Sequence, residues 1–199
     1  ITEEVDIELP DVELLKTEVN SNNRFWALGC ILADAKEART IVFSNTKREV
    51  DLTVKRLNNG GINCSALHGD HSQAVRERVI SELREGKIGI IVATDVAARG
   101  LDINDITLVI NMQPPNDADT FVHRIGRTGR MQQGGTAWTI LDTKNHVQMA
   151  LIEATINTKL QLKSVPNIDE PPIAKNNDIS DLADGWGMVP IQLNLGKKH

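Results

Sequence analysis

The chain has 199 residues, of which 40% are hydrophobic and 25% are charged. This composition is that of an ordinary globular protein, and the length suits one domain with tails. Only 3% of the residues are aromatic and Tyr is absent. This scarcity argues against a protein that binds single strands by stacking bases on aromatic side chains.

The net charge of −5 is distributed unevenly. Residues 1–18 hold seven acidic groups and one lysine, and residues 166–199 hold five acidic groups and three lysines. The stretch between them has 18 basic and 15 acidic residues, a balance of +3. This weakly basic body permits contact with a phosphate backbone but does not require it.

Cys30 and Cys64 lie in apolar stretches, which favours buried, reduced thiols over a metal or redox role. The five histidines show no ligand spacing, so no metal site is expected. No apolar run approaches 18 residues and no signal-peptide pattern is present. We therefore expect a soluble intracellular protein without membrane contact, and the sequence leaves nucleus or cytoplasm open.

The body of the chain alternates helical and strand-like segments. Helices are predicted over 23–38, 46–57, 72–83, 117–125 and 145–158, and strands over 40–44, 62–67, 88–93, 106–112 and 136–141. Thr46 can cap the second helix, and either Asp117 or Asp119 can cap the fourth. This alternation with short loops predicts an α/β fold, a parallel β-sheet sandwiched by helices.

The ends of the chain look different from this body. Residues 1–20 are interpreted as an N-terminal extension, either a linker or an addition to the edge of the sheet, with one weak strand over 5–9, and residues 21–165 as the domain. Residues 166–199 contain several prolines and no hydrophobic period, which predicts an extended or disordered tail.

Polar residues follow three of the predicted strands: Ser44–Thr46, Gly69–Asp70 and Thr94–Asp95. Ligands of open parallel sheets bind at the carboxyl ends of the strands. We therefore expect these residues to form a site at one edge of the sheet.

The run from His123 to Arg130 places Arg124, Arg127 and Arg130 at a spacing of three, with glycines between them. Guanidinium groups are planar, permanently charged and donate in a fork, so they suit phosphate oxygens. Three of them on one short segment indicate a polyphosphate ligand.

A second run, from Ala93 to Ile103, carries Thr94, Arg99, Gly100 and Asp102. Together the two runs resemble motifs V and VI of the DEAD-box RNA helicases. The resemblance covers about Ile41 to Asn157 and implies the second, C-terminal RecA-like helicase domain, a P-loop NTPase-like fold. His123 favours this group over relatives with Gln at that position. Phe121, Gln113 and Gln132 depart from the usual pattern.

The resemblance implies roles for individual residues. Arg127 and Arg130 would be arginine fingers for the γ-phosphate of ATP, and Asp102 would bind the ribose, with Gly100 also near the nucleotide. The RNA backbone would be bound by Thr94, Gly100, Gly69, Gln73, Arg76 and, most weakly indicated, Thr46. Contacts to the other helicase domain are implied for His123, Arg124 and Arg99.

The sequence has no Gly-x-x-x-x-Gly-Lys-Ser/Thr loop. The chain is therefore interpreted as half of a composite site, inactive alone, whose phosphate loop, DEAD motif and main magnesium ligands lie in a preceding RecA-like domain. The opening Ile1 is consistent with a fragment cut at the interdomain linker. Protein cofactors are possible partners. The alternatives are a non-catalytic helicase-like scaffold and a DNA-directed superfamily 2 helicase.

Overall fold

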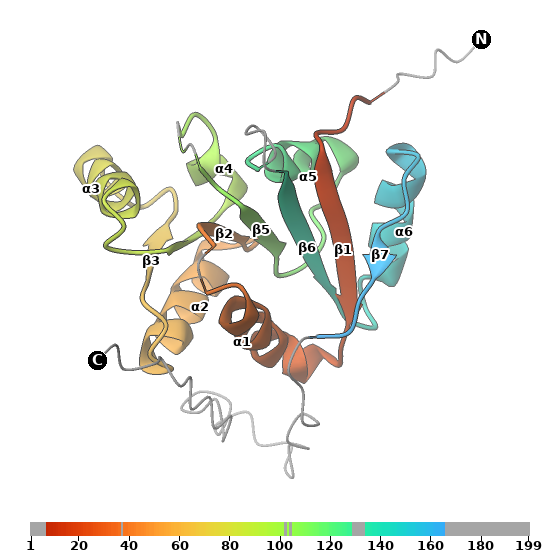
Figure 1. Cartoon of the computed structure of the whole chain (residues 1–199), viewed down its shortest axis with the longest axis horizontal. Coiled ribbons are helices and arrows are strands. Elements are labelled where there is room, and N and C mark those ends of the chain that lie inside the picture. The colour runs from red at the N-terminus through yellow and green to blue at the C-terminus, as the bar shows by residue number, and fades with distance from the viewer. Residues whose placement is uncertain (1–6, 37, 102, 104, 129–133, 166–199) are drawn as a thin grey trace.

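The structure, a computed structural model, describes residues 7–165 except 37, 102, 104 and 129–133. Its centre is a seven-stranded sheet with the order β3-β4-β2-β5-β6-β1-β7, in which every neighbouring pair is parallel (Figure 1). The strands are β1 (Val12–Glu18), β2 (Thr40–Phe43), β3 (Cys64–Leu67), β4 (Ile90–Ala93), β5 (Leu108–Asn111), β6 (Gly135–Leu141) and β7 (Gln161–Leu162). The predicted α/β class is confirmed.

Helices cover both faces of this sheet. They are α1 (Arg24–Asp34), α2 (Lys47–Asn59), α3 (Gln73–Arg84), α4 (Asp95–Ala98), α5 (Ala118–Ile125) and α6 (His146–Thr155), with a 3-10 turn, η1 (Ser21–Asn23), before α1. Core residues of α1 and α2 form one hydrophobic cluster, and those of α3 to α6 form the other. The two clusters are separated by the sheet, so the domain has three layers.

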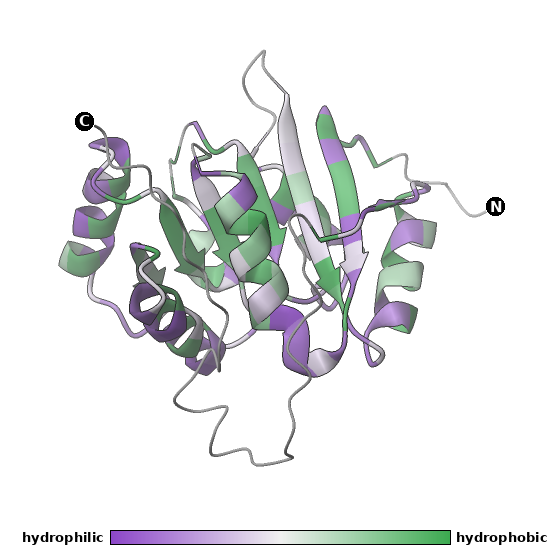
Figure 2. Ribbon diagram, turned by 60° about the horizontal axis from the view of Figure 1, so that its bottom comes forward, coloured by the Kyte–Doolittle hydropathy of each residue, from purple (hydrophilic) through white to green (hydrophobic). Residues whose placement is uncertain are grey.

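The strands at the centre of the sheet are buried on both faces. In β2, Ile41 and Phe43 belong to one cluster and Val42 to the other, and none is more than 1% exposed. Successive side chains of a strand point to opposite faces, so a strand covered on both sides must be apolar throughout. Figure 2 shows this as green central strands, with purple found mainly on several of the helices that flank them.

Three of the predicted helix starts are confirmed by their caps. The hydroxyl oxygens of Thr46 and Ser72 accept hydrogen bonds from the third residues of α2 and α3, at 3.2 and 3.3 Å. A carboxylate oxygen of Asp117 accepts from Thr120 N–H in α5 at 2.7 Å, so Asp117 rather than Asp119 is the cap. Each cap satisfies an amide that has no partner within its helix.

The interpretation of residues 1–20 as a linker is wrong for β1. Val12–Glu18 lies between β6 and β7, whereas no strand occurs within the described part of 5–9. β1 is hard to predict because it contains charged residues. Lys16 would be expected to face solvent, but its ammonium group binds Glu153 of α6 at 2.7 Å. A contact across 137 residues cannot be read from a local pattern.

Two predicted helices end earlier than expected. The helix predicted over 23–38 ends at Asp34, and the one predicted over 145–158 ends at Thr155. Beyond α6, Asn157 has φ of 50°, a left-handed conformation that ends helices. The chain then forms β7, a strand that the sequence does not predict. The tail predicted over 166–199 lies outside the described residues. Among the described helices, none is long and apolar enough to cross a membrane.

Candidate functional site

The carboxyl ends of four strands meet at one edge of the sheet. Thr94 N–H donates to Leu67 O at 3.2 Å, Ser44 N–H to Ala93 O at 3.1 Å, and Met112 N–H to Phe43 O at 2.9 Å. These bonds bring the loops after β2, β3, β4 and β5 side by side. These loops carry Thr46, Gly69 and Thr94 among the residues singled out in the sequence.

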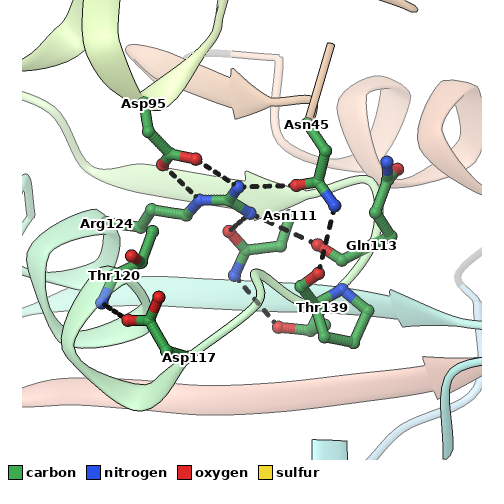
Figure 3. A network of polar contacts seen from close by, with 9 residues as sticks. Asn45, Asp95, Asn111, Gln113, Asp117, Thr120, Arg124 and Thr139 are labelled. Atoms are coloured by element: carbon green, nitrogen blue, oxygen red, sulfur yellow. Dashed lines mark hydrogen bonds and ion pairs between the residues drawn. The ribbon is translucent and has the colours of Figure 1, made fainter. Parts of the chain in front are cut away.

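Arg124 lies beneath this edge, and every N–H group of its guanidinium is hydrogen-bonded (Figure 3). Its Nε and Nη2 donate to the two carboxylate oxygens of Asp95 at 2.6 and 2.8 Å. Nη2 also donates to Asn45 Oδ1 at 2.8 Å, and Nη1 donates to Asn111 Oδ1 at 3.2 Å and to Gln113 O at 3.3 Å. All five N–H groups therefore have acceptors within the domain.

This arrangement does not fit the prediction that Arg124 contacts a second domain. The residue is 1% exposed, and its guanidinium carbon lies 5.1 Å from the centre of the Phe43 ring. A buried charge is stable only when it is paired and hydrogen-bonded, as this one is. Arg124 instead joins α5 to α4 and to the loops after β2 and β5.

The sequence gives no role to Asn111 and Gln113, which lie around Arg124. Asn111 is 0% exposed at the end of β5, and its amide donates to Thr139 Oγ1 at 3.1 Å. The Gln113 amide donates to Glu49 at 2.9 Å and its oxygen accepts from Arg24 at 3.4 Å. Gln113 therefore links α1, α2 and the β5–α5 loop. A polar residue at the end of an apolar run, here after Leu108–Ile110, is the sequence signal that could identify Asn111.

Arg127, His123 and Arg99 lie at the open surface above Arg124. His123 and Arg99 are exposed, and Arg127 is half-buried with Nη1 donating to Leu101 O at 3.2 Å. All three line a small cavity of about 10 Å³ next to Asp95. His123 and Arg127 also line a cavity of about 400 Å³, together with Glu8, Leu9, Pro10, Val122 and Gly126. The remaining nucleotide residues, Arg130 and Asp102, lie outside the described residues.

Thr128 lies in the same run as Arg127 and anchors it to the interior of the domain. It is 0% exposed, and its hydroxyl donates to Ile106 O at 2.8 Å. A Cβ atom at Gly135 would lie 1.9 Å from the Thr128 hydroxyl oxygen. Gly135 is therefore required because Thr128 packs against its backbone. No local pattern in the sequence indicates this pair.

A second group of donors lies after β3 and β4. Within the described residues, no acceptor is found for the backbone N–H groups of Gly69 and Gly100 or for the Thr94 hydroxyl. Gly100 has φ of 73°, a conformation that other residues rarely adopt. Free N–H and O–H donors on neighbouring loops are suited to phosphate oxygens.

Arg76 of α3 lies beside these donors. Its Nη2 donates to Ala97 O at 2.8 Å, and its Nε is buried without an acceptor among the described residues. Gln73 is exposed and donates to Glu77 at 3.1 Å. The Thr46 hydroxyl oxygen already accepts from Glu49 N–H, so its clearest task is to cap α2. The predicted RNA-binding residues thus lie at one edge, with Thr46 the weakest member.

A parallel sheet covered on both faces, with an arginine-rich carboxyl edge, places this chain in the class of RecA-like α/β domains. A family profile described as "Helicase conserved C-terminal domain" matches residues 23–132, more than half of the chain. The E. coli DEAD-box protein SrmB, whose crystal structure was solved in complex with the regulator of ribonuclease activity A (RraA), is 32% identical to this chain. The match covers 81% of this chain and 98% of that one, with a TM-score of 0.73. The chain therefore belongs to the helicase conserved C-terminal domain family of the DEAD-box proteins.

Other relatives agree with this assignment. The DEAD-box ATP-dependent RNA helicase CshA of Geobacillus kaustophilus is 40% identical over 165 residues, which are 83% of this chain and 35% of CshA. The chain thus spans about a third of the length of that curated relative. S. cerevisiae Dbp5, solved with RNA and ADP BeF3, is 26% identical with a TM-score of 0.76, over 83% of this chain and 45% of that one.

Proposed function

We propose that this chain is the second half of an ATP-dependent RNA helicase, to which it contributes arginine fingers and part of the RNA-backbone site. The observation that carries the proposal is the carboxyl edge of the sheet, which carries Arg127 together with the donors of Gly69, Thr94 and Gly100, for which the described residues provide no acceptor. Support also comes from CshA and Dbp5, which match this chain over 83% of its length.

For ATP binding, the chain offers positively charged side chains but no phosphate-binding loop. Arg127 lines the larger cavity and, beside Arg99, also the small one, so a polyphosphate bound in the larger cavity would meet the permanent positive charge of Arg127. The residues present therefore fit a triphosphate on one side only. When bound, ATP supplies a phosphoryl group whose transfer to water releases the energy for the cycle. Arg127 would stabilise the negative charge that develops on this group.

Arg130 and Asp102 remain predictions from the sequence, as a second finger and as a ribose acceptor. The phosphate loop and the main magnesium ligands would come from a preceding RecA-like domain, because no such loop occurs in this sequence. On this proposal the chain hydrolyses no ATP by itself. His123 and Arg99, both exposed, are suited to the contact with that domain.

For RNA, the donors of this edge suit the sugar-phosphate backbone and not the bases. Gly69 and Gly100 offer backbone N–H groups, Thr94 a hydroxyl and Arg76 a guanidinium group. Contacts of this kind position a strand without reading its sequence. We therefore propose RNA binding with low sequence specificity. ATP-driven closure of the two domains on one strand would separate short duplexes or remodel RNA–protein complexes.

The test is the ATPase activity of the full-length protein and of the isolated chain. With single-stranded RNA, the full-length protein should hydrolyse ATP faster, and DNA of the same sequence should stimulate it much less. The isolated chain should be inactive under both conditions. Equal stimulation by DNA would favour a DNA-directed helicase, and the absence of any ATPase activity would favour a non-catalytic scaffold.

A further inference from the structure

The turn that carries Gly69 is held by two histidines, by the Asp51 carboxylate and by an ion pair between Lys47 and Asp70. His68 is 5% exposed at the end of β3, and its Nε2 lies 2.9 Å from Asp51 Oδ1 of α2. The His71 ring stacks on the His68 ring with 4.1 Å between their centres. Neither this cluster nor Asp51 has a role in the site described above.

The amide hydrogen bonds of the turn identify the tautomer of His68. Asp70 N–H donates to His68 Nδ1 at 3.4 Å, so this nitrogen is an acceptor. A neutral imidazole with a lone pair on Nδ1 carries its proton on Nε2, and that proton points to Asp51. The Asp51 carboxylate therefore selects the tautomer in which His68 can hold the Asp70 amide.

The other amides of the turn follow the same pattern. His68 N–H donates to His71 Nδ1 at 3.4 Å, and His71 N–H donates to His68 O at 3.1 Å. With the Asp70 amide, three of the four N–H groups of residues 68–71 are thus used inside the turn. The fourth belongs to Gly69 and has no acceptor among the described residues. The bonds that close the turn leave one donor for an external ligand.

We propose that Asp51 is a positioning residue for RNA: by fixing the tautomer of His68, it holds the turn in the shape that presents Gly69 N–H to a phosphate oxygen. This inference rests on the proposed function. Asp51 suits such a task because its side chain is 62% exposed while the ring it binds is 6% exposed. A carboxylate that served only solubility would gain nothing from pointing at a buried ring.

The decisive comparison is between Asp51→Ala and Asp51→Asn in the full-length protein. Asp51→Ala removes the acceptor of the Nε2 proton and should weaken binding of single-stranded RNA, measured with a non-hydrolysable ATP analogue, by about tenfold. Asp51→Asn keeps an acceptor oxygen and should stay within about threefold of wild type. Glu85→Gln is the matched control, since it removes an exposed carboxylate at the far end of α3.

Turnover separates positioning from a general loss of structure. In Asp51→Ala, the RNA concentration for half-maximal ATPase activity should rise about tenfold, while kcat at saturating RNA should change by less than about twofold. Equal losses in both quantities would overturn the proposal, as would unchanged RNA affinity.

A double variant tests the route through His68. Asn at position 68 can place its oxygen near the position of Nδ1 and accept from the Asp70 amide, but it cannot reach Asp51. In the His68→Asn background, Asp51→Ala should therefore cost less than about twofold in RNA affinity. A full tenfold cost there would overturn the proposal. A wild-type protein that binds no RNA would overturn both proposals, whereas normal wild-type binding with an unaltered Asp51→Ala variant would overturn only this one.

Discussion

Arg124 and Asp95 form a two-point ion pair, with Nε 2.6 Å from Oδ1 and Nη2 2.8 Å from Oδ2. Asp95 begins α4, directly after Thr94 in the segment assigned to RNA, and Arg124 lies in α5, three residues before Arg127 in the segment assigned to ATP. The pair therefore ties the two candidate ligand segments together. A shift at one would be transmitted to the other through a bidentate contact.

Replacing Arg124 by Lys should destabilise the domain strongly. A lysine cannot donate in a fork, so it would leave some of the acceptors on Asp95, Asn45 and Asn111 unpaired. We expect a loss of about 3 kcal/mol in the free energy of unfolding, measured by urea titration of the chain. Arg78→Lys, at an exposed position of α3, is the control. A loss below about 1 kcal/mol for Arg124→Lys would show that the network adds little.

Gly135→Ala should also destabilise, for a steric reason. The added Cβ would lie 1.9 Å from the Thr128 hydroxyl oxygen and 2.8 Å from two further atoms of that side chain. Because Thr128 is 0% exposed, it cannot swing into solvent. The expected cost is about 2 kcal/mol, read from the urea midpoint. At Gly89, the nearest atom to an added Cβ is 3.9 Å away, so Gly89→Ala should be close to neutral.

Much of the fold could be predicted from local patterns. The central strands are short apolar runs, and the caps Thr46, Ser72 and Asp117 mark where α2, α3 and α5 begin. β1 could not be predicted because Lys16 is neutralised by Glu153, a partner distant in sequence. β7 is two residues long and too short to show a period.

The candidate site could likewise be predicted only in part from the sequence. Its position at the strand ends follows from the topology of a parallel sheet, and the arginine run is visible as a spacing. The sequence cannot tell which arginine is buried. Arg124 lies in the last turn of α5 and Arg127 lies two residues beyond its end, yet the first is 1% exposed and the second is half-buried at the surface. Which of them can meet a ligand depends on Asp95 and Asn111, from other elements.

Arg76→Ala should weaken RNA binding by the full-length protein to a similar extent for every RNA sequence. A single phosphate contact would be lost, so the slope of log affinity against log salt should fall by about one unit. Fluorescence anisotropy at several salt concentrations measures this slope. Arg78→Ala, on the same helix and paired with Glu82, should leave it unchanged. A loss confined to one RNA sequence would be inconsistent with a backbone contact.

Glu153 predicts an acid-sensitive link between β1 and α6. Burial by itself raises its pKa, but hydrogen bonds from Lys16, Leu160 N–H and Lys159 outweigh burial and hold the pKa below the usual 4.5. A lowered pKa in the folded state contributes stability above pH 4.5, which is lost as the pH falls through the folded value.

Unfolding midpoints in urea between pH 7 and pH 3 test this link. The Glu153→Gln variant should be less stable than wild type at pH 7, and the difference should shrink below pH 4.5 as wild type loses its charge. A difference that is constant over the whole range would contradict the lowered pKa.

The most direct test of the central claim is the RNA-stimulated ATPase rate of the full-length protein carrying Arg127→Ala. If Arg127 completes a nucleotide site shared with another domain, the rate should fall by about 10³-fold, while RNA affinity without nucleotide and the unfolding midpoint stay close to wild type. Arg78→Ala should be fully active. An Arg127→Ala variant with a near-normal rate would contradict the account.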